Sequence, residues 1–178
     1  MNILDEIVAN KRDEVAAFKT ARPMSELESA ARRRGRAQDF VAALHSVPIG
    51  LIAEVKRRSP SAGPIREPFD AKSIAQAYEN AGAQAVSVLM DRKFFGGGED
   101  DFAAVRSAVA LPLLYKEFII DEWQIWHAAS LGASAALLIA AVLFVLTAAV
   151  AFAVVAITRS PEAEAMNTAR TSVMEKYG

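Results

Sequence analysis

Apolar runs of strand length alternate with helix-like segments through the middle of the chain, and this alternation restricts the fold more than any other feature. The runs are GLIAEVK (50–56), QAVSVLM (84–90), LPLLYKEF (111–118) and SAALLIAAV (134–142). Strand and helix repeat at a spacing of about 25 residues, which is typical of a parallel α/β fold. The similar stretches ENAGAQAVSVL and ASLGASAALLI favour repeated βα modules.

Helices are expected before and between these strands. Residues 3–18 carry an apolar stripe opposite charged residues, and a polar helix is expected over 24–34. Asp70 is a suitable N-cap for a helix that Gly82 would end. Further helices are expected over 102–110 and 121–132, and loops over 59–70 and 94–101.

Composition removes several classes of function. The 178 residues carry a net charge of −1, so bulk charge does not favour binding to nucleic acid. There is no cysteine, which excludes disulfides and thiolate metal sites and fits a cytoplasmic protein. His45 and His127 lack partners at metal-ligand spacing, and no glycine-rich nucleotide motif is present. We therefore expect no metal and no nucleotide cofactor.

Charged residues stand where two of the predicted strands end, and parallel α/β folds place their chemistry at such ends. The first strand ends in Glu54 and Lys56, and the third in Lys116 and Glu117. Two lysines and a glutamate at one edge can protonate a substrate or hold an anion. The alternative is that Glu54 and Lys56 only form an ion pair at the rim. The loop SPSAG (59–63) offers hydroxyls and backbone N–H groups to a phosphate or carboxylate, or is only a turn.

Four segments follow one another as recognisable motifs: ILDEIVANKRDEV (3–15), LIAEVKRRSPSAGPIREPFD (51–70), AQAVSVLMDRKFFGGGEDD (83–101) and LPLLYKEFIIDEWQI (111–125). Together with the patterns E-x-K-x-x-S-P-S and K-[DE]-F-I, they resemble the indole-3-glycerol-phosphate synthase family from Met1 to about Val142. The resemblance implies a partial (β/α)8 TIM barrel of about four βα units with an N-terminal helical extension, and the residues after it are expected to form an apolar C-terminal helix that the family does not explain.

The resemblance also implies a lyase of tryptophan biosynthesis with a small phosphorylated substrate. Such an enzyme closes the indole ring of 1-(2-carboxyphenylamino)-1-deoxyribulose 5-phosphate with release of CO2 and water, and it uses no cofactor. By resemblance Lys116 is the general acid and Glu54 orients it. Lys56 is similar to the cation that holds the substrate carboxylate before decarboxylation.

Five further positions match the family's substrate-binding residues. Ser59 and Ser61 are similar to serines near the phosphate, whereas Phe95, Phe118 and Leu137 match apolar residues that enclose the anthranilate ring. Ordinary core packing is the alternative for the two phenylalanines. The chain departs from the family at Met90, where threonine is usual, and at Gly96–Gly98, which replace x-G-S.

The resemblance read from these motifs ends near Val142, inside an apolar run from Ala135 to Ile157. We expect an N-terminal extension over 1–48, half of a barrel over 49–142, and an apolar helix with a polar tail over 143–178. Residues 135–157 leave three alternatives: a frameshift or rearrangement after the fourth strand, a buried helix that closes a half-barrel, or a membrane span of about 20 residues.

These alternatives lead to different functions. The first hypothesis is a synthase impaired by truncation. The others are a non-catalytic half-barrel that needs a partner chain, and a remnant anchored to a membrane through 135–157. Four βα units leave two sheet edges open, so self-association is expected.

Overall fold

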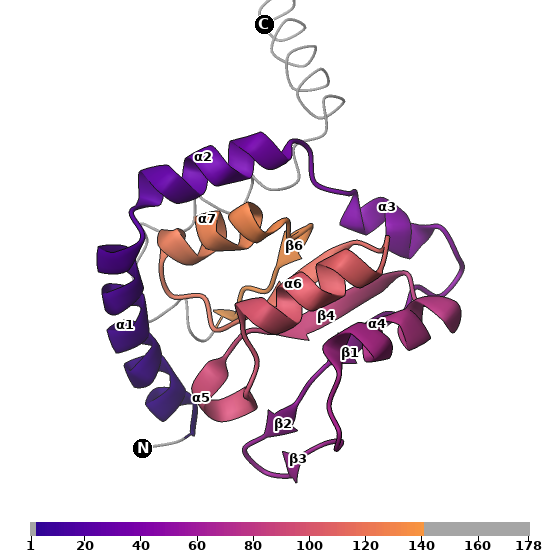
Figure 1. The fold of residues 1–178 in the computed structure, drawn as a ribbon, viewed down its shortest axis with the longest axis horizontal. Coiled ribbons are helices and arrows are strands. Elements are labelled where there is room, and N and C mark those ends of the chain that lie inside the picture. Colours follow the sequence, from indigo (N-terminus) through magenta and orange to yellow (C-terminus); the bar gives the residue numbers. More distant parts are fainter. Residues whose placement is uncertain (1–2, 141–178) are drawn as a thin grey trace, which may run out of the picture.

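The computed structural model describes residues 3–140. Its central feature is a parallel sheet of four strands in the order β1 (Ile52–Val55), β4 (Ala85–Leu89), β5 (Leu113–Lys116) and β6 (Ala135–Ala136). The connections carry α4 (Ala71–Asn80), α6 (Glu99–Ala108) and α7 (Glu122–Leu131), which cover one face of the sheet (Figure 1). The predicted α/β architecture with parallel strands is confirmed.

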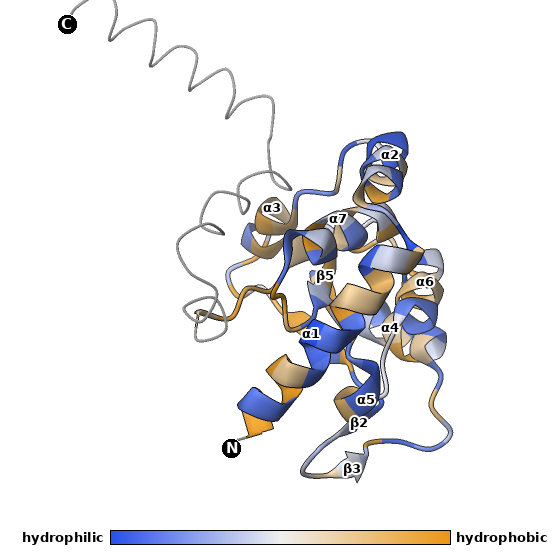
Figure 2. Ribbon diagram, turned by 90° about the vertical axis from the view of Figure 1, so that its left-hand side faces the viewer, coloured by the Kyte–Doolittle hydropathy of each residue, from blue (hydrophilic) through white to orange (hydrophobic). Residues whose placement is uncertain are grey.

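Three helices precede the sheet: α1 (Ile3–Ala21), α2 (Met24–Arg34) and α3 (Phe40–His45). Figure 1 shows α1 and α2 running along the outer side of the molecule, with α2 beside α7. In Figure 2, polar and apolar residues both occur along α1, as expected for a helix with one covered face. The predicted helices over 3–18 and 24–34 are confirmed, and α1 extends three residues further.

Two predicted loops contain short elements that the sequence patterns did not indicate. Residues 59–70 were expected to form a loop, but β2 (Arg58–Ser59) pairs antiparallel with β3 (Gly63–Pro64). The stretch 94–101 overlaps α5 (Arg92–Phe95) and the first turn of α6, which begins at Glu99. Three acidic residues in that first turn suit the positive end of a helix dipole, and this explains the earlier start.

The predicted caps are largely correct. The side chain of Asp70 accepts a hydrogen bond from the backbone N–H of Lys72 (3.2 Å), and α4 ends two residues before Gly82. The predicted strand over 134–142 is shorter, because β6 covers only Ala135–Ala136. Its last residues, the predicted segment 143–178 and most of the run 135–157 lie outside the described residues. Within 3–140, no helix is both long and apolar enough to cross a membrane.

The two faces of the sheet have different roles because side chains alternate along a strand. Val86, Val88, Leu113 and Tyr115 pack with Phe102 of α6 in the main core. The alternate positions therefore lie on the opposite face, which in a barrel is the interior. Glu54 and Lys116 belong to this second set, as do their register partners Ser87 and Leu89.

A close backbone approach fixes the loop after β4. A Cβ atom at Gly97 would lie 1.9 Å from the carbonyl oxygen of Leu89, so no other residue fits without moving the backbone. Gly96 has a φ of 70°, in the left-handed region that glycine adopts readily. These two glycines allow the chain after α5 to pass close to the end of β4.

Truncation of a core leucine tests this packing. Leu113 is fully buried, whereas Leu51 is 54% exposed just before β1. Leu113→Ala should lower the free energy of unfolding by about 2–5 kcal/mol through lost burial and a cavity. The same truncation at Leu51 should change it by less than about 0.5 kcal/mol. Urea unfolding of both variants measures the difference, and equal losses would contradict the assigned core.

Candidate active site

A glutamate bridges two lysines at the carboxyl end of the sheet. Lys116 Nζ lies 2.6 Å from Glu54 Oε2, and Lys56 Nζ lies 3.0 Å from Glu54 Oε1. Glu54 belongs to β1 and Lys116 ends β5, with β4 between them. All three side chains are about one-third exposed. The sequence prediction that these residues meet at one edge is therefore confirmed in position.

The two lysines keep the Glu54 carboxylate charged. Partial burial acts to raise the pKa of Glu54, but hydrogen bonds from Lys116 and then Lys56 outweigh it, so the pKa lies below its ordinary value. Each carboxylate oxygen accepts from a different lysine. Glu54 thus holds both ammonium groups beside one another in a site that solvent and a substrate can reach.

An aromatic pair lies at the same end of the sheet. The rings of Phe95 and Phe118 have centroids 6.1 Å apart; Phe95 ends α5, which follows β4, and Phe118 lies in the loop after β5. Leu137 directly follows β6, and its backbone N–H donates to the carbonyl of Tyr115 (3.1 Å). The predicted apolar residues therefore stand at the ends of three adjacent strands.

The two predicted serines lie on the β2–β3 hairpin. The hydroxyl of Ser59 accepts a hydrogen bond from the backbone N–H of Ala62 (3.1 Å), and Ser61 lies in the exposed turn. Arg58 donates to the backbone carbonyl of Lys93, which attaches the hairpin to α5. The structure places these serines after β1, the strand that carries Glu54 and is directly followed by Lys56.

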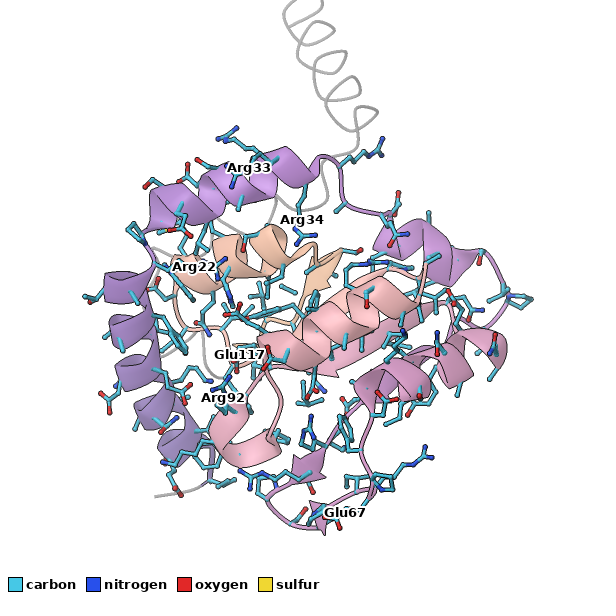
Figure 3. All side chains as sticks on the ribbon, in the orientation of Figure 1. Arg22, Arg33, Arg34, Glu67, Arg92 and Glu117 are labelled. Carbon is cyan, nitrogen blue, oxygen red and sulfur yellow. The ribbon has the colours of Figure 1, made fainter. Side chains whose placement is uncertain are left out.

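A second, buried charge cluster lies behind this site, and the sequence patterns did not predict it. Lys11 of α1 is 3% exposed, and its Nζ lies 2.6 Å from Glu14, 2.9 Å from Asp91 and 3.1 Å from Glu117. Figure 3 shows Glu117 on the side of the sheet that faces α1. A sequence signal exists, because Lys11 stands midway in the buried stripe Ile7, Lys11, Val15.

The cluster contains three carboxylates for one ammonium group. Burial disfavours the charge of Lys11, but Glu117 and the other two acids outweigh it and raise the pKa of Lys11. Burial also raises the pKa of Glu117 to about 7, against the attraction of Lys11, with a further contribution from the charge of Asp91. The excess of acid explains the raised pKa of Lys11, whereas burial is the main cause of the raised pKa of Glu117.

Parallel strands that alternate with helices and carry charged residues at their carboxyl ends are typical of the class of (β/α)8-barrel enzymes, whose active sites lie at this face. The comparisons with known proteins give the particular family: a family model described as indole-3-glycerol phosphate synthase matches residues 4–159, and the chain belongs to this family. The match continues past Val142 into residues that the structure does not describe. The resemblance carried by the four sequence motifs is confirmed, whereas the predicted boundary at residue 142 stays a prediction.

Relatives bearing this name come from distant organisms. The indole-3-glycerol phosphate synthase of Arabidopsis thaliana, described as chloroplastic, is 49% identical over 80% of this chain and 37% of its own length. Those of Aromatoleum aromaticum and Rhodopirellula baltica are 44% and 48% identical and are covered over 56% and 54% of their lengths. The chain spans about half the length of the curated relatives it matches.

Titration of Glu54 tests the lysine bridge. Because its pKa is lowered on folding, Glu54 contributes stability above the ordinary carboxyl pKa, and this contribution is lost as the pH falls through the folded value. Lys116→Met or Lys56→Met should raise the pKa of Glu54 toward its ordinary value, as followed by carboxyl ¹³C NMR. Lys72→Met, on the outer helix α4, is the control. An unchanged pKa in the first two variants would refute the bridge.

Proposed function

We propose that the chain supplies the Lys116–Glu54–Lys56 part of an indole-3-glycerol-phosphate synthase active site. The reaction is ring closure of 1-(2-carboxyphenylamino)-1-deoxyribulose 5-phosphate, with loss of CO2 and water. The observation that carries the proposal is the Glu54 carboxylate, which accepts from both lysines at the carboxyl end of the sheet. The residue types suit the reaction, because dehydration needs a proton donor and the substrate carboxylate needs a cation.

The roles proposed for the three residues are those that the resemblance to the family implies, and the contacts among the three side chains support them. Lys116 is the general acid that protonates the oxygen that leaves as water, and Glu54 orients its ammonium group through the 2.6 Å contact. Lys56 holds the substrate carboxylate until CO2 departs. Ion pairing with Glu54 keeps the two ammonium groups close without direct contact between them.

The remaining predicted residues would bind the substrate. Phe95 and Phe118 would enclose the anthranilate ring together with Leu137, because a flat apolar ring needs an apolar slot. Ser59 and Ser61 would approach the phosphate from the β2–β3 hairpin. We propose that the reaction needs no cofactor, and that the protein acts in the cytoplasm.

A second candidate is a half-barrel that becomes catalytic, or serves another role, only with a partner chain. It is favoured by the exposed apolar residues at the first strand of the sheet: Leu51 is 54% and Ile52 is 40% exposed. Within residues 3–140, β1 and β6 form the two ends of the sheet and each pairs on one side only. The membrane-anchored alternative concerns residues outside the described range and stays a hypothesis, which detergent-dependent extraction would test.

An activity assay tests the first candidate. We expect little or no formation of indole-3-glycerol phosphate, followed by indole fluorescence, from the chain alone. Addition of a fragment with the remaining strands of the Aromatoleum aromaticum relative should restore turnover. Lys116→Ala should lower the restored kcat/KM by at least about 100-fold, the usual contribution of a general acid.

The matched control is Lys72→Ala, on the helix-covered outside. Turnover that survives Lys116→Ala would refute the role given to this lysine. A wild-type mixture that binds the fragment but shows no turnover would refute the proposed activity.

Light scattering tests the second candidate. We expect the isolated chain to form dimers or larger assemblies through its open sheet edges. Ile52→Lys should reduce this association because it places a charge on the edge strand β1. Ile65→Lys changes an isoleucine of similar exposure beyond the hairpin and should have no effect. A monodisperse wild-type monomer would contradict the expectation.

A further inference from the structure

The buried cluster of Lys11, Glu14, Asp91 and Glu117 joins three segments that are distant in sequence. Lys11 lies in the middle of α1, Asp91 follows β4 after one residue, and Glu117 directly follows Lys116 at the end of β5. Asp91 is fully buried and Glu117 is 7% exposed. A buried ammonium group therefore connects the N-terminal helix to two neighbouring strand ends.

The two strand-end carboxylates divide their oxygens in a similar way, although Lys11 donates a hydrogen bond to Glu117 and forms only an ion pair with Asp91. Asp91 gives Oδ2 to Lys11, and its Oδ1 accepts from the backbone N–H of Phe94 (2.7 Å). Glu117 gives Oε2 to Lys11, and its Oε1 accepts from the backbone N–H of Phe118 (2.8 Å). One oxygen of each acid thus binds the lysine, and the other fixes the backbone that carries an aromatic residue.

These two backbones carry the aromatic pair of the site. Asp91 caps α5, which ends at Phe95, and the ring of Phe95 lies against that of Phe118. Glu117 stands between Lys116 and Phe118 in the chain. Any movement of Glu117 away from Asp91 would therefore separate the two rings and would also move the backbone of Lys116.

We infer that Lys11 is a positioning residue for the active site: by holding Asp91 and Glu117 together it sets the spacing of Phe95 and Phe118 and the placement of Lys116. The inference rests on the proposed function for the role of the rings and of Lys116. Without Lys11, Asp91 and Glu117 would lose the ammonium group that contacts one oxygen of each, so the contact that holds the two strand ends at this spacing would be gone.

The helix offers a matched comparison in Lys19. Its Nζ lies 2.8 Å from Asp121, which caps α7, just as Asp91 caps α5. Lys19 is 45% exposed, and Asp121 lies three residues beyond Phe118 rather than beside a site residue. Both lysines attach α1 to the cap of a barrel helix, but only Lys11 reaches the acids that hold the aromatic pair.

The acids offer a second matched comparison. Glu14 and Glu117 both bind Lys11, but the second oxygen of Glu14 accepts from Asn10 within α1 (2.7 Å). Only Glu117 extends the cluster to Phe118. If Lys11 only anchored α1, neither Glu14→Gln nor Glu117→Gln would move the rings of a folded variant, whereas a positioning role makes Glu117 the sensitive one.

The experiment uses the complete chain and its variants with two readouts. Aromatic NMR reports ring contacts between Phe95 and Phe118. Aliphatic NMR reports the ε-methylene signal of Lys116. Kinetics with the added barrel fragment report KM and kcat. Lys11→Met and Glu117→Gln should remove the ring contacts, shift the Lys116 signal and lower kcat/KM by about 10- to 100-fold, mainly through KM.

Four controls separate positioning from stability. Lys11→Arg should restore most of the ring contacts, whereas Lys19→Met and Glu14→Gln should leave them unchanged. Leu27→Ala truncates a fully buried residue of α2 and should lower stability without moving the rings. Glu117→Gln keeps Lys11 and removes one excess charge, so it decides the question if Lys11→Met does not fold.

Two results would overturn the inference. One is retention of the ring contacts and the Lys116 signal in Glu117→Gln and in folded Lys11→Met. The other is an equal effect of Glu14→Gln and Glu117→Gln. Absence of turnover in the wild-type mixture would refute the proposed function instead, and the NMR comparison would still decide whether Lys11 positions the aromatic pair.

Discussion

The parallel register of β1, β4 and β5 is the constraint on which the site depends. Parallel pairing brings the strand ends to one edge, and the alternation of side chains then decides which residues face the barrel interior. Glu54 is level with Ser87, and Leu89 is level with Lys116, so Glu54 and Lys116 share one face across β4. A shift of one residue in either strand would bury a charge among the helices and expose a core side chain.

Two charge clusters lie at this edge of the sheet, one with an excess of lysine and one with an excess of acid. In the first cluster, two lysines share the Glu54 carboxylate and remain open to solvent. In the second cluster, three carboxylates share the buried ammonium group of Lys11. Burial of unequal charge is costly unless every group is hydrogen-bonded, and the backbone N–H groups of Phe94 and Phe118 supply two of these bonds. The second cluster therefore ties local backbone geometry to a distant helix.

The residues of the candidate site could be predicted from the sequence, whereas the buried cluster around Lys11 that lies beside the site could not. Glu54, Lys56 and Lys116 could be placed because apolar runs locate strands and parallel strands share an edge. The contacts of Lys11 could not, because a helical lysine usually lies in solvent, and two of its three partners, Asp91 and Glu117, are about 80 and 106 residues away. The β2–β3 hairpin was missed since two-residue strands have no periodicity. Phe95 and Phe118 were expected to enclose the anthranilate ring of the substrate, and this contact stays a prediction.

The attachment of α1 also has a consequence for the order of folding. Its two lysines pair with acids that lie about a hundred residues later in the chain, at separations of 106 for Glu117 and 102 for Asp121. During synthesis α1 is made before β1, whereas Glu117 and Asp121 do not exist until β5, the third strand of the sheet, has been made. The other two partners of Lys11 are made earlier, Glu14 in α1 itself and Asp91 after β4. Contacts of such long range form late because loop closure precedes them. A helix that is made before the whole sheet is therefore among the last elements to dock.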